Sequence, residues 1–130
     1  MIERLDHLVL TVASINDSVR FYRDGLGMDL VHFGAGRTAL AFGQHKINLH
    51  EQGAEFEPKA LRPTPGSADF CLITRTPLIE VARRLESVGS AIEEGPVKRT
   101  GACGPLISVY VRDPDNNLVE VSNEVGEGPP

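Results

Sequence analysis

Apolar and polar residues alternate in short runs that divide the chain into two halves of similar order. Residues 5–12, LDHLVLTV, are apolar and rich in β-branched side chains, which predicts a strand. A helix is predicted next, because Ser14 suits an N-cap, apolar residues follow at helical spacing, and Gly25 and Gly27 end the pattern. Three more strands are then predicted, at residues 29–33, 37–43 and 45–51.

A proline-rich stretch separates the halves, and the same order begins again after it. Pro58, Pro63 and Pro65 suit neither helix nor strand, so the stretch predicts a linker. The elements predicted beyond it are a strand at 68–74, a helix at 77–89, and strands at 91–99, 105–113 and 116–122. This internal repeat predicts one domain made of module 1 (about 4–52), a linker (about 53–66), module 2 (about 67–123) and a frayed tail (124–130).

Four side chains that suit a metal ion fall at related places in the two halves. Asp69 lies 62 positions after His7 on the first strands, and Glu120 lies 70 positions after His50 on the last strands. Period-two alternation puts each of them on the less apolar face of its strand, opposite a face predicted to lie under a helix. Glu120 stands between Val119 and Val121, where a carboxylate costs free energy unless a cation meets it.

Other polar residues share those faces and are candidates for contact with a substrate. They are Thr11, Asn48, Cys71 and Ser122. Two glycine-containing stretches have patterns typical of loops. Residues 34–37, GAGR, lack the lysine and following helix of a phosphate loop and predict a hairpin turn, whereas residues 101–104, GACG, predict either a mobile lid or a plain connection.

Composition narrows the classes of partner. The chain has 130 residues and a net charge of −5, with no basic run, which argues against nucleic acid as a partner. No apolar stretch approaches the roughly 20 residues that span a bilayer. The first residues lack the layout of a signal peptide, so we expect a cytoplasmic protein in which Cys71 and Cys103 are reduced.

The opening LDHLVLTVASINDSVRFYRDGLGM and the closing VYVRDPDNNLVEVS resemble the vicinal oxygen chelate superfamily of glyoxalases, bleomycin-resistance proteins and dioxygenases. The chain is most similar to the short lactoylglutathione-lyase-like virulence proteins of that superfamily. The resemblance implies an α+β fold in which two βαβββ modules form curved mixed sheets around a central cavity, as a single domain over residues 1–130. It also implies a homodimer with sites formed between subunits.

The resemblance further implies one divalent metal ion per site, either Zn, Ni, Co, Mn or Fe(II), with ligands His7, His50, Asp69 and Glu120. Glu120 would also act as the base. The implied activity is that of a metal-dependent lyase or isomerase, acting through an enediolate on a small α-oxo-aldehyde or its thiol adduct, with glutathione as a candidate co-substrate. The set departs from glyoxalase I, which usually presents His and Glu in each module.

Three other functions and several ordinary roles stay open at this point. The chain could be a metal-free protein that sequesters a small molecule, a fosfomycin-type thiol transferase, or an Fe(II) dioxygenase whose triad would be His7, His50 and Glu120. Stoichiometric metal in the isolated protein would exclude the first. Asp69 could simply cap a turn, and His50 could be solvated at the end of its strand.

Overall fold

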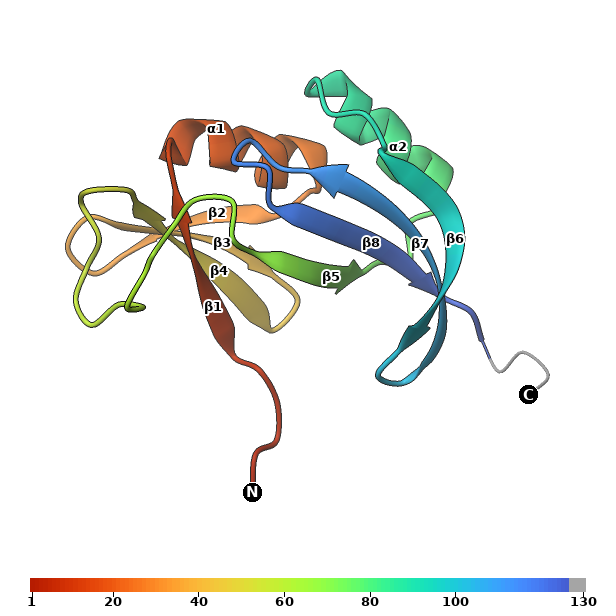
Figure 1. Ribbon diagram of the computed structural model, residues 1–130, viewed down its shortest axis with the longest axis horizontal. Helices are drawn as coiled ribbons and strands as arrows, with labels where there is room; N and C mark the ends of the chain where they lie inside the picture. The colour runs from red at the N-terminus through yellow and green to blue at the C-terminus, as the bar shows by residue number, and fades with distance from the viewer. Residues whose placement is uncertain (127–130) are drawn as a thin grey trace.

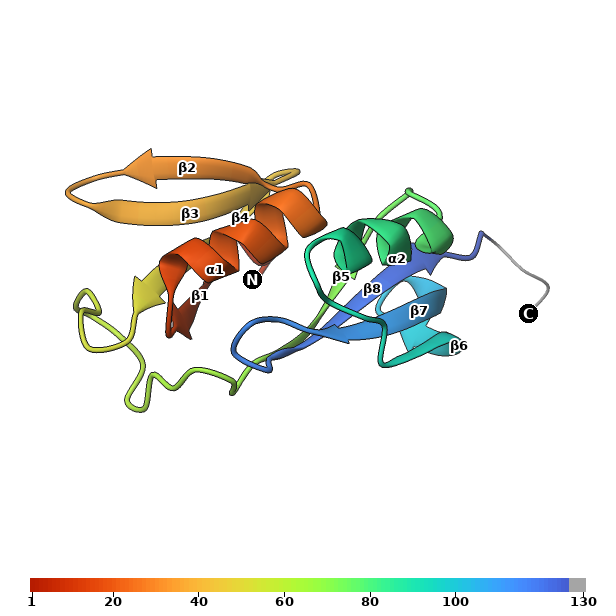
Figure 2. The same ribbon diagram turned by 90° about the horizontal axis from the view of Figure 1, so that it is seen from above.

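The computed structural model describes residues 1–126, so the predicted frayed tail, 124–130, lies outside the described residues from position 127 onward. Two four-stranded sheets lie side by side, and both helical segments pack on the same side of them (Figures 1 and 2). The sheets are not closed around one another. Within residues 1–126, no helix is long and apolar enough to cross a membrane.

Each sheet has a parallel pair at one edge and antiparallel pairs beyond it. In the first sheet the order is β1 (His7–Val12), β4 (His45–Glu51), β3 (Arg37–Phe42) and β2 (Asp29–Phe33). In the second sheet it is β5 (Asp69–Ile73), β8 (Leu118–Glu124), β7 (Gly104–Arg112) and β6 (Glu94–Gly101). The predicted α+β class and the repeat of strand, helix and three strands are confirmed.

The first helical segment begins as predicted and then widens. The Ser14 hydroxyl accepts a hydrogen bond from the Asp17 amide at 3.2 Å, which caps α1 (Ile15–Val19). The segment continues as the π-helix η1 (Arg20–Gly25), in which Phe21 and Tyr22 are both buried. The sequence pattern did not predict the π-helix.

The core lies between the helices and the covered face of each sheet. Leu10 and Val12 of β1 are buried there, as the alternation predicted, and so are Val119 and Val121 of β8. The helix α2 (Leu78–Ser87) contributes Leu85, which is fully buried. The opposite faces of both sheets are left for the polar candidates.

The turn between β7 and β8 is a buried hydrogen-bond network. The Asp113 carboxylate accepts bonds from the Tyr22 hydroxyl at 2.7 Å, the Asn117 side chain at 2.8 Å, and the Asp115 and Asn117 amides at 2.9 Å. The Asn117 side-chain oxygen accepts from the Ala68 amide at 2.8 Å. Burial, followed by the neighbouring Asp113, raises the pKa of the Tyr22 hydroxyl far above its usual range. The turn therefore joins η1 to the start of β5.

Glycines occupy key positions in the loops between the elements. Residues 52–68 form turns without helix or strand, as predicted for the linker. Gly66 has a φ of 85°, and a Cβ there would lie 2.6 Å from the Asp115 carbonyl oxygen, so only glycine fits. Residues 34–37 form the predicted hairpin turn between β2 and β3. Gly101 pairs with Gly104, so that stretch is a tight hairpin between β6 and β7.

Candidate functional site

Strand pairing corrects the predicted equivalence of the last strands. Asn48 of β4 pairs with Val9 of β1, and Glu120 of β8 pairs with Cys71 of β5. Since Cys71 follows Val9 by the same 62 positions that relate the first strands, Asn48 is the counterpart of Glu120. The offset between the last strands is therefore 72 positions rather than 70.

The same register fixes which candidate ligands lie near one another. Asp69 and Glu120 are diagonal neighbours on adjacent parallel strands, offset by two residues or about 7 Å of strand rise. His7 and Asn48 have the same relation in the first sheet. His7 pairs with Lys46, so His50 lies four residues further along the sheet, or about 13 Å of strand rise. That spacing is too long for both imidazoles to bind one ion from the same sheet.

The predicted ligands line three different cavities of the single chain. His7 and Cys71 line a mostly apolar cavity of about 480 Å³. Asp69 and Glu120 line a second cavity of about 390 Å³, and His50 lines a third of about 420 Å³. Over residues 1–126, no group of three or more His, Cys, Asp and Glu side chains is close enough to hold a metal ion.

Glu120 is half-buried and is held through one oxygen. The Ser108 hydroxyl donates to its Oε2 at 2.7 Å, and Ser122 lies 3.4 Å from the same oxygen. The two serine hydroxyls lie 2.6 Å apart, and the Cys71 Sγ lies 3.2 Å from Ser122. Both contacts to the carboxylate go to Oε2, so the serines hold the carboxylate through that oxygen. Hydroxyl donors thus lower the cost of placing a carboxylate in this apolar strand.

The thiol beside this carboxylate stays protonated at neutral pH. Burial raises the pKa of Cys71, and the neighbouring Glu120 raises it as well. A protonated thiol is a poor nucleophile, so Cys71 acts here as a weak hydrogen-bonding group in contact with Ser122.

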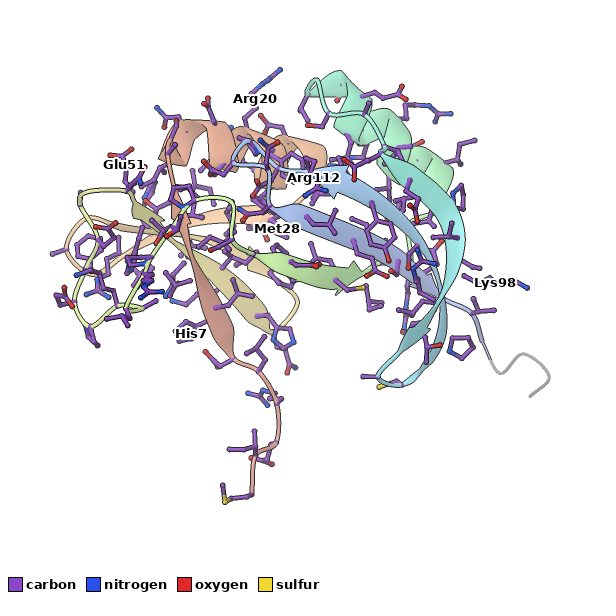
Figure 3. The ribbon with its side chains drawn as sticks, in the orientation of Figure 1. His7, Arg20, Met28, Glu51, Lys98 and Arg112 are labelled. Atoms are coloured by element: carbon purple, nitrogen blue, oxygen red, sulfur yellow. The ribbon has the colours of Figure 1, made fainter. Side chains whose placement is uncertain are left out.

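His7 is exposed, and its imidazole contacts the carboxylate of the preceding residue. Its Nδ1 lies 2.8 Å from the Asp6 carboxylate, and this bond lowers the pKa of Asp6. When Nδ1 donates to a carboxylate, Nε2 is the nitrogen left for a metal ion. Figure 3 shows His7 near the start of β1, on the side of the sheets away from both helices.

His50, by contrast, is buried, although a solvated position at the strand end was one expectation. It is only 7% exposed, and the Phe56 ring packs edge-on at 5.6 Å between ring centres. The Arg37 guanidinium lies 4.6 Å from the centre of the same phenyl ring. Burial first, and Arg37 second, lower the pKa of His50, so its imidazole is neutral at physiological pH.

Three residues near Glu120 were missed in the sequence. Ser108 donates to Glu120, Tyr110 pairs with it across the strands, and Arg99 donates to the Tyr110 hydroxyl at 2.7 Å. The signal for two of them was present, since Ser108 and Tyr110 alternate with buried valines along β7. Arg99 lies on the irregular strand β6, where alternation gives no guide.

Comparisons with known proteins bear on this arrangement. The model of the Glyoxalase/Bleomycin resistance protein/Dioxygenase superfamily matches residues 4–121. Virulence protein STM3117 of Salmonella typhimurium is 56% identical over 125 residues, which cover 96% of this chain and 87% of that protein. Its crystal structure superposes with a TM-score of 0.91, covering 96% of this chain and 99% of the other.

Two further proteins extend the comparison. Glyoxalase domain-containing protein RDO1 of Mycosarcoma maydis is 52% identical over 122 residues, covering 94% of this chain and 69% of that protein. The structure of integron cassette protein VCH_CASS1, from the mobile metagenome of V. cholerae, is 57% identical with a TM-score of 0.92. That superposition covers 96% of this chain and 98% of the other.

Proposed function

Because the chain belongs to the glyoxalase/bleomycin resistance protein/dioxygenase superfamily, we propose that it is a metal-dependent lyase or isomerase acting on a small α-oxo-aldehyde or its thiol adduct. The observation that carries the proposal is the setting of Glu120, a half-buried carboxylate on the open face that Ser108 holds through Oε2. An oriented carboxylate of this kind suits removal of a proton next to a carbonyl group.

We assign His7, Asp69 and Glu120 to the metal ion and Asn48, rather than His50, to the fourth position. The assignment follows the strand register, in which His7 with Asn48 and Asp69 with Glu120 have the same diagonal spacing. Among residues 1–126, the buried side-chain oxygen of Asn48 has no hydrogen-bond partner, which suits an oxygen ligand. This mixed donor set fits Zn, Ni, Co, Mn or Fe(II) and does not select among them.

The residues of the chain would divide the reaction between them. A divalent ion held here supplies a Lewis acid that stabilises negative charge developing on the substrate oxygens. Glu120 takes a proton from the carbon next to the carbonyl group and returns it to the neighbouring carbon, so no oxidant is consumed. Ser108 donates to Oε2 and so fixes the orientation of the carboxylate that carries the proton.

A second copy of the chain would complete the site. Members of this superfamily bind small molecules and often dimerise. Here His7 and Glu120 line different cavities, and apolar side chains beside them are exposed, with Val9 at 45% and Ile73 at 52%. Exposed apolar residues next to polar groups are typical of an interface. We propose that His7 and Asn48 of one subunit face Asp69 and Glu120 of its partner.

Replacing Glu120 by glutamine tests the proposed chemistry. The purified protein would be loaded separately with each divalent metal and assayed with methylglyoxal plus glutathione, and with methylglyoxal alone. Loss of the base in Glu120→Gln is expected to lower kcat by about 10²- to 10⁴-fold. Glu124→Gln, an exposed carboxylate at the end of the same strand, is the matched control and keeps full activity. Absence of turnover by the wild type with every metal contradicts the proposal.

Mixing two inactive variants tests the shared site. If each site takes His7 from one subunit and Glu120 from the other, His7→Ala mixed with Glu120→Gln forms mixed dimers with one intact site. Equal mixing then restores about a quarter of the wild-type activity. Sites formed within one chain would give no restoration. Sedimentation measurements on the same samples confirm that dimers have formed and exchanged.

A further inference from the structure

A separate cavity of about 420 Å³ lies between the first sheet and the linker. Thr11 of β1 and His50 of β4, which pair with each other, belong to the sheet side of its lining. The linker segment 58–68 supplies the opposite wall. Figure 2 shows the chain leaving β4 and passing this end of the first sheet before it reaches β5.

The lining of this cavity is positively charged although the whole chain is acidic. Lys59 and Arg62 line it, and no aspartate or glutamate of the described residues 1–126 does, whereas the chain as a whole carries a net charge of −5. Hydroxyl groups of Thr11, Thr64 and Ser67 add hydrogen-bonding capacity. Lys59 also pairs with Glu57, so Arg62 is the cation of the lining with the greater share of its charge available to a ligand. The pattern is that of a site for a compact oxyanion.

His50 contributes an unused hydrogen-bonding group to the same cavity. Its Nδ1 is buried and has no hydrogen-bond partner in the part of the chain that the structure describes, so Nε2 is the nitrogen left to meet a bound group. A buried acceptor without a partner costs less than a buried N–H without one, which favours the tautomer with its proton on Nε2. In that tautomer the ring donates a hydrogen bond, as an oxyanion requires.

The linker wall is held in place before any ligand arrives. The Ser67 hydroxyl donates to the Thr64 carbonyl at 2.8 Å, and the Thr64 hydroxyl donates to the Arg62 carbonyl at 3.1 Å. At one end Phe56 packs against His50, and at the other the Ala68 amide donates to Asn117. Residues held in this way lose little conformational entropy when they bind a ligand.

We propose that this cavity binds an oxyanion, a carboxylate or phosphate group carried by the substrate at a distance from its reacting carbonyl. Arg62 and Lys59 supply the charge, and His50 and Thr11 supply hydrogen bonds. Only the statement that the anion belongs to the substrate rests on the proposed function. The link between the two sites is Val9, which lines this cavity and pairs with Asn48.

Anion binding can be measured without metal or turnover. Inorganic phosphate and, separately, acetate would be titrated into the protein while the ring signals of His50 are followed by NMR at constant pH. Saturable shifts are expected in the wild type, and Arg62→Glu is expected to weaken binding by about tenfold or more. Lys98→Glu, an exposed charge reversal on β6, is the matched control and binds as the wild type does. The stronger of the two titrations identifies the anion as phosphate or carboxylate.

Two results would overturn the inference: no saturable shift of His50 in the wild type, or equal affinity in Arg62→Glu and the wild type. The variants are compared only after their melting temperatures are found to be the same. A second arm uses α-oxo-aldehydes with and without a remote anionic group, where Arg62→Glu raises KM for the anionic compound alone. Anion binding without turnover would contradict the proposed function and leave this site in place, whereas turnover without anion binding would do the opposite.

Discussion

The two sheets carry different chemistry at equivalent positions. In the second sheet, Glu120 accepts a hydrogen bond from Ser108 and lies beside Ser122. In the first sheet, the counterpart Asn48 has a buried side-chain oxygen to which no described residue donates a hydrogen bond. The next residue on that face, His50, lines the linker cavity. At equivalent positions, the second sheet therefore presents the hydrogen-bonded carboxylate of Glu120, and the first sheet presents the uncharged amide oxygen of Asn48.

The turns that precede β4 and β8 also differ between the two sheets. In the first sheet β3 joins β4 through the short turn Gly43–Gln44, which holds no other element. In the second sheet β7 joins β8 through Asp113–Asn117, whose side chains bind η1 and the start of β5. The beginning of β8, the strand that carries Glu120, is therefore fixed by a hydrogen-bond network. Among residues 1–126, no such network precedes β4.

Asp113→Ala breaks this difference with the largest expected effect. It leaves four donors without their acceptor, three of them in buried bonds, and the free energy of unfolding is expected to fall by about 4 kcal/mol. Urea denaturation followed by circular dichroism measures the loss. Asp24→Ala, at an exposed ion pair with Arg23, is the control and changes stability little. A loss below about 1 kcal/mol for Asp113→Ala would show that the network is dispensable.

Asn48→Asp sharpens the comparison by giving the first sheet a carboxylate at the same position. If Asn48 is a ligand, the added charge is expected to tighten binding of a divalent ion by about tenfold, an effect of about 1.4 kcal/mol. Calorimetric titration with Zn²⁺ and Mn²⁺ measures the change. Asn16→Asp, an exposed substitution of the same kind on α1, controls for net charge. Equal affinity in the two variants would remove Asn48 from the ligand set.

Asp115→Asn gives the smallest expected effect on stability, and this effect depends on pH. Burial first, and Asp113 among the neighbouring acids, raise the pKa of Asp115 above 3.8, so ionising it costs more in the folded than in the unfolded chain. Stability supplied by the neutral carboxyl is therefore lost as pH rises through this range. The melting temperature of Asp115→Asn minus that of the wild type is expected to increase as pH rises from about 3 to about 6. Asp29→Asn, at an exposed position of β2, is the control.

Local patterns predicted the elements, and distant contacts decided the site. Alternation and the Ser14 cap were enough to locate β1 and α1, because both depend on neighbouring residues. The equivalence of His50 with Glu120 was wrong, because register depends on which residues pair between strands far apart in sequence. Phe56, which packs against His50, lies in the linker, where the sequence shows no periodicity of apolar residues.

The hydrogen-bond network at Asp113 could not be predicted from the sequence for a related reason. The sequence marks residues 113–117 as a polar turn, but the phenol that meets the carboxylate stands 91 positions earlier. Phe21 and Tyr22 are both buried in η1, a π-helix that the pattern did not predict. Whether two chains share a site depends on surfaces that a single sequence does not relate to one another.

The bond from Tyr22 to Asp113 makes the two halves depend on each other for their integrity. Both groups are buried, Tyr22 with 0% and Asp113 with 3% of its surface exposed, and each comes from a different half of the chain. Expressed alone, the first half would carry a phenol without an acceptor, and the second a carboxylate lacking one of its donors. A protease cut within the linker is therefore expected to yield a nicked but associated protein rather than two free fragments.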